Sequence, residues 1–209
     1  ALWGMELDDG FFCIEEHVLD GTHFVPGWAL LPVGAAGGHA HMVPASSVGS
    51  DDEEGLAALT ASSLTTGTAK RTLKELNLYL SERAAGLSAG ASTKQFSLRM
   101  DAPARFAPEV FTLMKEVLES PAFREEDVAR EKREQIAAVV SREESATGLM
   151  GRRLRHFLFQ KGAYAHRSGG DPVRVADFTR EDTARFWKEQ AQRPWVLCVA
   201  GDFDRAQVE

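Results

Sequence analysis

Ser88 comes nearest to a catalytic motif in this chain, because it stands at the centre of the sequence Gly86-Leu87-Ser88-Ala89-Gly90. In many hydrolases a Gly-x-Ser-x-Gly sequence forms a strained turn from a strand into a helix, which exposes the serine as a nucleophile. Here the pattern predicts a helix before the motif and a strand after it, which is the reverse order. His166 and Asp171, the candidate base and acid, both fall in one polar segment. A serine hydrolase using Ser88 is therefore the least supported function that the sequence offers.

His39 and His41 are the second candidate, since residues two apart on a strand share a face and two imidazoles can hold a metal ion. A stable site also needs a carboxylate or a third histidine, and none follows at a recognisable spacing. The pair therefore fits two surface histidines better than a metal centre. His166 is a lone histidine in a predicted loop, and such residues are more often exposed than functional.

The charge balance excludes two classes of partner. The chain of 209 residues has 24 Lys and Arg against 31 Asp and Glu, which gives a net charge of -7. This sign disfavours binding to nucleic acid or to an anionic membrane surface. The longest apolar runs, such as Trp28–Val33, are far shorter than the roughly 20 residues of a membrane-spanning helix. We therefore expect no nucleic-acid partner and no membrane span.

The two cysteines, Cys13 and Cys198, lie near opposite ends of the chain. They form neither a metal knuckle nor a dense disulfide framework, and they can pair only if the two ends of the fold meet. The sequence alone decides neither their pairing nor the compartment, which stays open between an exported or periplasmic location and the cytoplasm.

The hydrophobic pattern predicts the elements that must position any site. Short apolar runs bounded by glycine indicate strands, and spacings of three and four indicate helices. The glycine-rich run Gly34–Gly38 is interpreted as a turn. Grouped hairpins and helix pairs predict an α+β fold, a largely antiparallel sheet with helices packed on one face, formed by residues 1–209 as a single domain. The expected strands are 11–14, 28–33 and 39–48, a hairpin over 87–100 with a break at 92–95, and 195–200; the expected helices are 51–67 with an acidic start, one ending at Gly86, 106–118, 125–144, 149–158 and one capped by Thr179.

Several short landmarks come in order between Gly55 and Phe203, at compatible spacings over about three quarters of the chain. They are Gly55-Leu56-Ala57, Leu64-Thr65-Thr66-Gly67-Thr68, Ala84-Ala85-Gly86-Leu87-Ser88-Ala89, Ser120-Pro121-Ala122-Phe123, Gly162-Ala163-Tyr164-Ala165 with Gly169-Gly170, and Val199-Ala200-Gly201-Asp202-Phe203. Each landmark is weak alone, but together they resemble the pitrilysin or insulinase type of zinc peptidase, family M16.

The resemblance implies a degenerate metal site. Active members carry His-x-x-Glu-His on the first helix, where two histidines hold zinc and the glutamate is the general base. Here Ala58 and Ser62 stand at the histidine positions and Ala61 at the glutamate position. The third ligand, a glutamate on a later helix, falls on Ala138, with Glu131 and Glu134 close enough to leave that register open. The resemblance therefore implies no zinc and no catalysis in this chain, while the parent protein is expected to be a zinc metalloendopeptidase.

Family members are built from tandem copies of one domain, so the resemblance implies a non-catalytic copy excised from a longer zinc protease. Its expected partner is an active M16-type domain, in the same polypeptide or in a partner subunit, which supplies the zinc. By the same analogy it closes the peptidase chamber, and its strand Ser88, Ala89, Gly90, Ala91, Ser92 contacts a peptide or unfolded polypeptide. A plain edge strand is an equally good reading of that segment. The alternative function is a structural assembly subunit, since core proteins of respiratory complexes resemble this family too.

Overall fold

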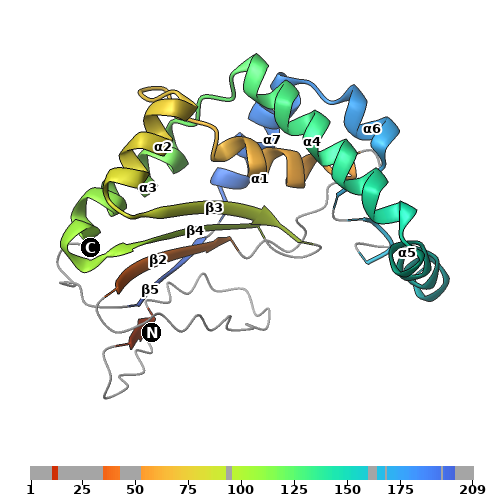
Figure 1. The fold of residues 1–209 in the computed structure, drawn as a ribbon, viewed down its shortest axis with the longest axis horizontal. Coiled ribbons are helices and arrows are strands. Elements are labelled where there is room, and N and C mark those ends of the chain that lie inside the picture. Colours follow the sequence, from red (N-terminus) through yellow and green to blue (C-terminus); the bar gives the residue numbers. More distant parts are fainter. Residues whose placement is uncertain are drawn as a thin grey trace.

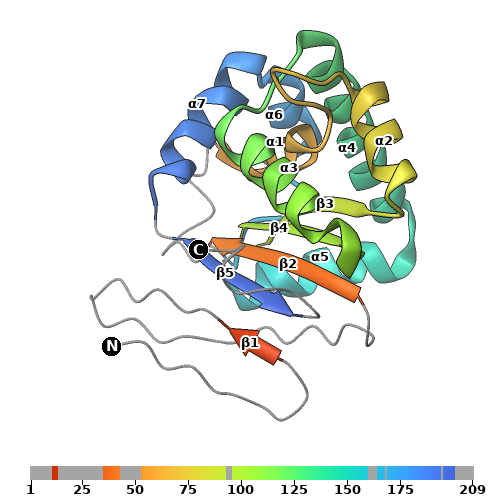
Figure 2. The same ribbon diagram turned by 90° about the vertical axis from the view of Figure 1, so that its left-hand side faces the viewer.

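The computed structural model shows a five-stranded antiparallel sheet in the order β1-β5-β2-β4-β3. The hairpin β3–β4 lies at one edge, and the short strand β1 lies at the other edge beside β5 (Figure 2). Side chains are described for residues 53–92, 96–159, 164–167 and 169–193, and the backbone is also described for the three remaining strands. The strands are β1 Phe11–Cys13, β2 Ala35–Met42, β3 Gly86–Ala91, β4 Phe96–Pro103 and β5 Trp195–Ala200.

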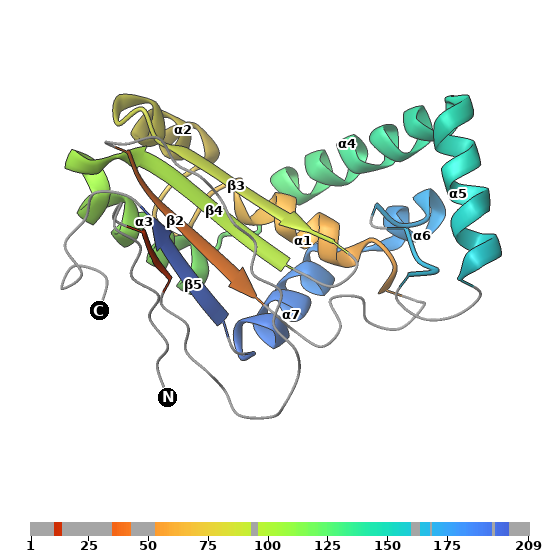
Figure 3. The same ribbon diagram turned by 90° about the horizontal axis from the view of Figure 1, so that it is seen from below.

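The helices that pack on the sheet all cover the same face (Figure 1). α1 lies over β3, α2 and α3 cover the other end of the hairpin, and α7 lies beside α1. α4 crosses behind α1 and continues beyond the sheet, where α5 turns back beside its C-terminal end (Figure 3). The helices are α1 Leu56–Leu64, α2 Leu73–Glu82, α3 Ala107–Glu119, α4 Glu125–Glu144, α5 Ala146–Leu158, α6 Pro172–Asp177 and α7 Arg180–Ala191, with a short 3-10 helix Ala104–Phe106 before α3.

The core between the sheet and the helices has two parts, which meet at Ala89 and Leu118. Under α1 and α7 it contains the rings of Phe96 and Trp187, whose centroids are 5.7 Å apart and whose planes are tilted by 43°. Under α2 and α3 it contains aliphatic side chains such as Leu98. Every second residue of β4 is buried, so its other residues form the sheet face that lies away from the helices.

Several local predictions are confirmed. The expected α+β class, with an antiparallel sheet and helices on one face, is the observed one. The charged helix spans 125–144 as predicted, and three acidic residues, Glu125, Glu126 and Asp127, occupy its first turn. At α7 the Thr179 hydroxyl accepts a hydrogen bond from the Asp182 N–H, and the Asp182 carboxylate accepts one from the Thr179 N–H. The Thr179 hydroxyl also donates to this carboxylate at 2.7 Å, and this bond, followed by the one from the Thr179 N–H, lowers the pKa of Asp182.

Other predictions are wrong. Ala35–Gly38 is not a turn but part of β2, between β4 and β5, where two backbone ladders outweigh the poor strand propensity of glycine. The first helix has no acidic first turn, because it begins only at Leu56; Glu53 instead pairs with Arg185 at 3.0 Å. The second helix ends at Glu82, so Gly86 belongs to β3. The short helix α6 was not predicted, and the expected strand 28–33 lies outside the described residues.

Candidate functional site

α1 begins at a backbone clamp made of two glycines. Gly55 caps the helix with a φ of 96°, and a Cβ there would lie 2.8 Å from the Cα of Gly170, whose own φ is 77°. Only glycine allows both this left-handed conformation and this close approach. From α4, the Gln135 amide donates hydrogen bonds to the carbonyls of Gly55 at 3.0 Å and Gly169 at 2.9 Å. The start of α1 is therefore fixed against α4 and the 169–170 turn.

The far end of α1 is fixed by a buried carboxylate. Glu116 on α3 accepts hydrogen bonds from the Thr68 hydroxyl and the Arg71 guanidinium, and Arg124 donates to the Thr68 carbonyl at 2.9 Å. Burial of Glu116 favours its neutral form, but the bonds from Arg71 and Thr68 outweigh that effect and lower its pKa. The loop after α1 is therefore held by a charged network.

The positions of the expected zinc motif carry no metal donor of the usual kind. Ala58 and Ser62 lie one turn apart on the same face of α1 and are half-buried, whereas Ala61 is buried in the core. The Ser62 hydroxyl donates a hydrogen bond to the Leu59 carbonyl at 3.1 Å, so its proton is engaged within the helix. Two methyl groups and one neutral hydroxyl cannot replace two imidazoles and a carboxylate.

The predicted position of the third ligand lies elsewhere on α4. Ala138 is exposed, whereas Gln135 and Val139 are on the side of α4 that meets the Gly169 turn. Of the two acidic alternatives, Glu131 is 3.3 Å from Arg130, and Glu134 is exposed. Within the described residues, no group of three or more His, Cys, Asp or Glu side chains could hold a metal ion. The register of the third ligand stays a prediction.

The predicted substrate strand lies at an edge of the sheet. β3 covers four of the five predicted residues, with Ser92 directly after it, and among the described strands it pairs with β4 alone. Ala89 and Ala91 pack against the core under α1, whereas Ser88 is exposed on the opposite face. The Ser97 hydroxyl donates to the Gly90 carbonyl at 3.4 Å, so this carbonyl is directed toward β4.

This direction fixes which backbone groups face outward. In an antiparallel ladder the N–H and C=O of one residue point to the same side, and the side alternates along the strand. Because Gly90 points toward β4, Leu87, Ala89 and Ala91 direct their N–H and C=O groups away from it. Their small or half-buried side chains leave this edge accessible to another extended backbone.

Ser88 and the histidine pair His39 and His41 lie on strands of the sheet. Ser88 lies inside β3 rather than on a turn from strand to helix, and its register partner is Arg99. His39 and His41 fall on the sheet face away from the helices, since His39 pairs with Arg99 and His41 with Ser97. No side-chain position is described for either histidine.

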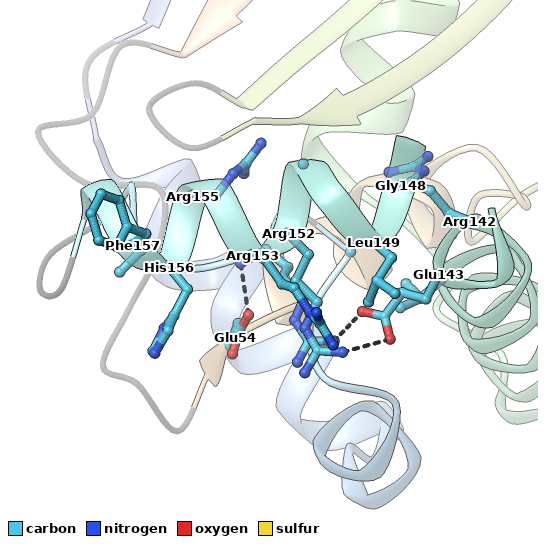
Figure 4. A pocket seen from close by; sticks show the side chains of 15 residues that line it. Glu54, Arg142, Glu143, Gly148, Leu149, Arg152, Arg153, Arg155, His156 and Phe157 are labelled. Atoms are coloured by element: carbon cyan, nitrogen blue, oxygen red, sulfur yellow. Dashed lines mark hydrogen bonds and ion pairs between the residues drawn. The ribbon is translucent and has the colours of Figure 1, made fainter. Parts of the chain in front are cut away.

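A groove of about 740 Å³ lies beyond the sheet, between α4, α5 and residues 165–169. The carboxylate of Glu143 lines this groove (Figure 4) and forms ion pairs with Arg152 at 2.9 Å and with Arg167 at 2.6 Å. Glu54, just before α1, accepts from the Arg167 N–H at 2.7 Å and lies 4.0 Å from His166. His166 therefore belongs to a structural network that connects this groove with the start of α1.

α5 presents an apolar surface that sequence reasoning missed. None of its residues is buried, and Phe157 is 77% exposed and Met150 65% exposed. The large apolar side chains of α5 that are exposed form what we call the α5 apolar surface: Leu149, Met150, Leu154, Phe157 and Leu158. The signal in the sequence was an amphipathic stripe, which shows that one side of a helix is apolar but not what covers it.

The antiparallel sheet with α1 packed against β3 defines an α+β domain, and sequence comparison gives its family. Residues 46–166, more than half of the chain, match the family described as Insulinase (Peptidase family M16). The chain therefore belongs to peptidase family M16. Among curated proteins, none matches it significantly.

Solved structures with low sequence identity share the fold. A "peptidase M16 inactive domain" from Pseudomonas fluorescens superimposes with a TM-score of 0.77 at 19% identity, covering 100% of this chain and 48% of that one. A protease from Helicobacter pylori gives a TM-score of 0.78 at 15% identity, with 100% and 48% covered. The periplasmic protease PqqL from Escherichia coli gives 0.75 at 16% identity, with 99% and 22% covered. The chain thus spans at most about half the length of these relatives. No helix within its described residues is long and apolar enough to cross a membrane.

Proposed function

We propose that this chain is the non-catalytic copy of the M16 domain in a zinc protease, and that it acts by packing against a copy that carries zinc. The observation that carries the proposal is α1: both ends are clamped as a structural helix, while Ala58, Ala61 and Ser62 offer no zinc ligand set. The inactive label of the Pseudomonas fluorescens domain supports the same interpretation. The periplasmic location of the Escherichia coli relative is the ground for proposing export.

Metal analysis tests the loss of catalysis. The purified chain is saturated with zinc and dialysed exhaustively, and its peptidase activity is measured on an unfolded polypeptide before and after. We expect near-zero zinc per chain and no cleavage. One tightly held zinc per chain, lost in a Ser62→Ala variant, would place a working metal site on α1 and overturn the proposal.

The α5 apolar surface is the proposed contact with the zinc-bearing copy. A soluble domain rarely leaves so many large apolar side chains exposed on one helix, and such patches mark interfaces. The occupant we propose is a second M16 domain, because the chain spans only 48% of two structurally similar proteins and a further half is present there. The arginines that line the neighbouring groove favour an acidic rim on that domain.

Footprinting tests this contact. Hydroxyl-radical labelling of Phe157 is compared between the chain alone and the assembly isolated through a tag on this chain, with Tyr79 on α2 as the internal reference. We expect Phe157 to lose its labelling in an assembly whose other component carries His-x-x-Glu-His. Equal labelling in both samples, or an assembly without that motif, would instead favour the structural-subunit alternative.

The outer edge of β3, which pairs with no other described strand, is the proposed contact with substrate. An extended peptide that adds to this edge would pair with the outward N–H and C=O groups of Leu87, Ala89 and Ala91. This mode recognises backbone, so it suits unfolded polypeptides of varied sequence. Bulky substitutions at Ala89 or Ala91 would not test it, because both side chains face the core.

A proline substitution removes one outward N–H, because a ring carbon takes the place of that hydrogen at the strand edge. For Ala89→Pro we expect the Kd for fluorescein-labelled, reduced and carboxymethylated α-lactalbumin to rise about tenfold, because one hydrogen bond is lost and the ring blocks the edge. The matched control is Ser88→Val, which changes the exposed face of β3 and keeps every backbone group. Unchanged affinity in a folded Ala89→Pro variant, or no binding by the parent chain, would exclude this edge as the substrate site.

A further inference from the structure

The strand register brings the only two cysteines of the chain to directly opposed positions. Cys13 is the last residue of β1, Cys198 lies within β5, and the antiparallel pairing of these strands matches Cys13 with Cys198. Directly opposed residues lie on the same face of a sheet. Two residues separated by most of the chain are therefore neighbours in the fold.

The backbone geometry of this pairing suits a disulfide. Directly opposed residues in an antiparallel ladder have Cα atoms about 4.5 or 5.5 Å apart, depending on whether the pair is hydrogen-bonded. Disulfides span Cα separations of about 4.4 to 6.8 Å. Either kind of pair therefore brings the two cysteines within bonding reach without a change of register.

We propose that Cys13 and Cys198 form an intramolecular disulfide that ties the edge strand β1 to β5. β1 has three residues and pairs with β5 alone among the described strands, so a covalent bond would add most where the ladder is shortest. Such bonds persist in oxidising compartments, which agrees with export. The inference does not depend on the proposed function, because it follows from the register alone.

The oxidant is a small disulfide such as oxidised glutathione. One cysteine thiolate attacks it, forming a mixed disulfide and releasing one glutathione thiolate. The second cysteine thiolate then attacks the protein sulfur of the mixed disulfide and releases the other glutathione. The two cysteines are oxidised by two electrons, the glutathione disulfide is reduced to two thiols, and the two cysteine protons are transferred through the buffer.

The experiment compares folded and unfolded chain in the same glutathione buffer. We expect the folded chain to lose the mass of two hydrogen atoms, to show no free thiol, and to give one proteolytic fragment containing both Cys13 and Cys198. In guanidinium chloride the linked fraction should fall about tenfold or more, because the fold no longer raises the effective concentration of the two thiols.

A register variant is the matched control. The double substitution Cys198→Ser with Val199→Cys moves the cysteine by one residue, which places it on the other face of the sheet. We expect no linked fragment from this variant although it also has two thiols. Three results would overturn the proposal: thiols that stay free in the folded chain, a disulfide-linked dimer, or thiols that EDTA alone releases, which would indicate a metal thiolate with His39, the partner of Cys198 on β2.

Discussion

α1 and α5 differ in how far they are buried against the rest of the protein. Seven of the nine residues of α1 are buried, and none of the thirteen residues of α5 is. α1 is the helix that carries the metal in active relatives by resemblance, and here it is held in place at both ends without any metal ligand. The comparison shows that α1 is packed on nearly all sides, whereas the large apolar side chains that the described residues leave uncovered lie mainly on α5.

The difference has a simple physical cause. α1 lies between β3, α4 and α7, so nearly every side chain on it contacts another element. α5 contacts mainly the C-terminal part of α4, to which it is joined at Ser145, and the Ser145 hydroxyl caps it by accepting from the Gly148 N–H at 3.0 Å. With so few neighbours among the described residues, α5 keeps an apolar side that is exposed. The following substitutions compare the two helices.

Truncation of one leucine on each helix should give the largest contrast in stability. Leu59 on α1 has no exposed surface, so Leu59→Ala should lower the free energy of unfolding by about 3 kcal/mol through lost burial and a cavity. Leu154 on α5 is 53% exposed, and Leu154→Ala should change it by less than about 0.5 kcal/mol. Urea unfolding followed by circular dichroism measures both. Equal losses would mean that α5 is as well packed as α1.

Replacing a glycine by alanine should lower the stability of the fold near α1 and raise it within α5. Gly170, which supports the start of α1, has a φ of 77°, and a Cβ there would lie 2.5 Å from the Glu54 carbonyl oxygen. Gly170→Ala should therefore destabilise by about 2 kcal/mol. Gly151 lies within α5 with nothing within 4 Å of an added Cβ, so Gly151→Ala should stabilise by about 0.5 to 1 kcal/mol. Thermal unfolding decides this, and two shifts in the same direction would contradict the placement of Gly170.

The sequence predicted what is determined locally. Helix α4, the cap at Thr179 and the β3–β4 hairpin follow from periodicity and from side chains a few residues apart. β2 was missed in part because Ala35–Gly38 has no strand pattern, and its pairing partners come from distant parts of the chain. The exposure of α5 was missed for a similar reason, since a stripe of apolar residues does not say whether it finds a partner.

In the candidate site, too, features within one helix could be predicted from the sequence, whereas features that join distant segments could not. Ala58, Ala61 and Ser62 could be named from sequence because the resemblance fixes their spacing within one helix. The position of the third ligand depends on the rotation of α4 against α1, which no local pattern encodes, so Ala138 stays a prediction. The clamp of Gly55, Gln135 and Gly170 joins three distant segments and was found only in the fold.

Glu116, which holds the loop after α1, should make the free energy of unfolding depend on pH in the acidic range. The lowered pKa of Glu116 in the folded chain means that its ionised form stabilises the fold above the ordinary glutamate pKa of 4.5. This stabilisation is lost as the pH falls from about 5 through the folded pKa, because the native carboxylate must then be protonated. Glu116→Gln should lower stability by about 1 to 2 kcal/mol at pH 7 and flatten the profile below pH 5.

The control for this profile is an exposed carboxylate on the same helix. Glu119 lies 3.8 Å from Lys115 on the surface of α3, so Glu119→Gln should stay within about 0.5 kcal/mol of the parent chain. Urea unfolding at a series of pH values between 2 and 7 compares the two variants. A Glu116→Gln profile as steep as that of Glu119→Gln would show that the network at Thr68 does not anchor α1 electrostatically.

A substitution in the α5 apolar surface should have the smallest effect on stability and the greatest effect on association with the partner domain. Phe157→Asp replaces a ring that is 77% exposed, so the free energy of unfolding should change by less than about 0.5 kcal/mol. The same change puts a charge into the α5 apolar surface, and we expect weaker binding of a hydrophobic dye by the chain alone and loss of the partner domain from the assembly. Lys115→Asp, on the exposed side of α3, is the matched control. If Phe157→Asp unfolds the domain, α5 is part of its core; if the partner domain stays bound, the interface lies on another surface, and the contrast between α1 and α5 loses its functional meaning.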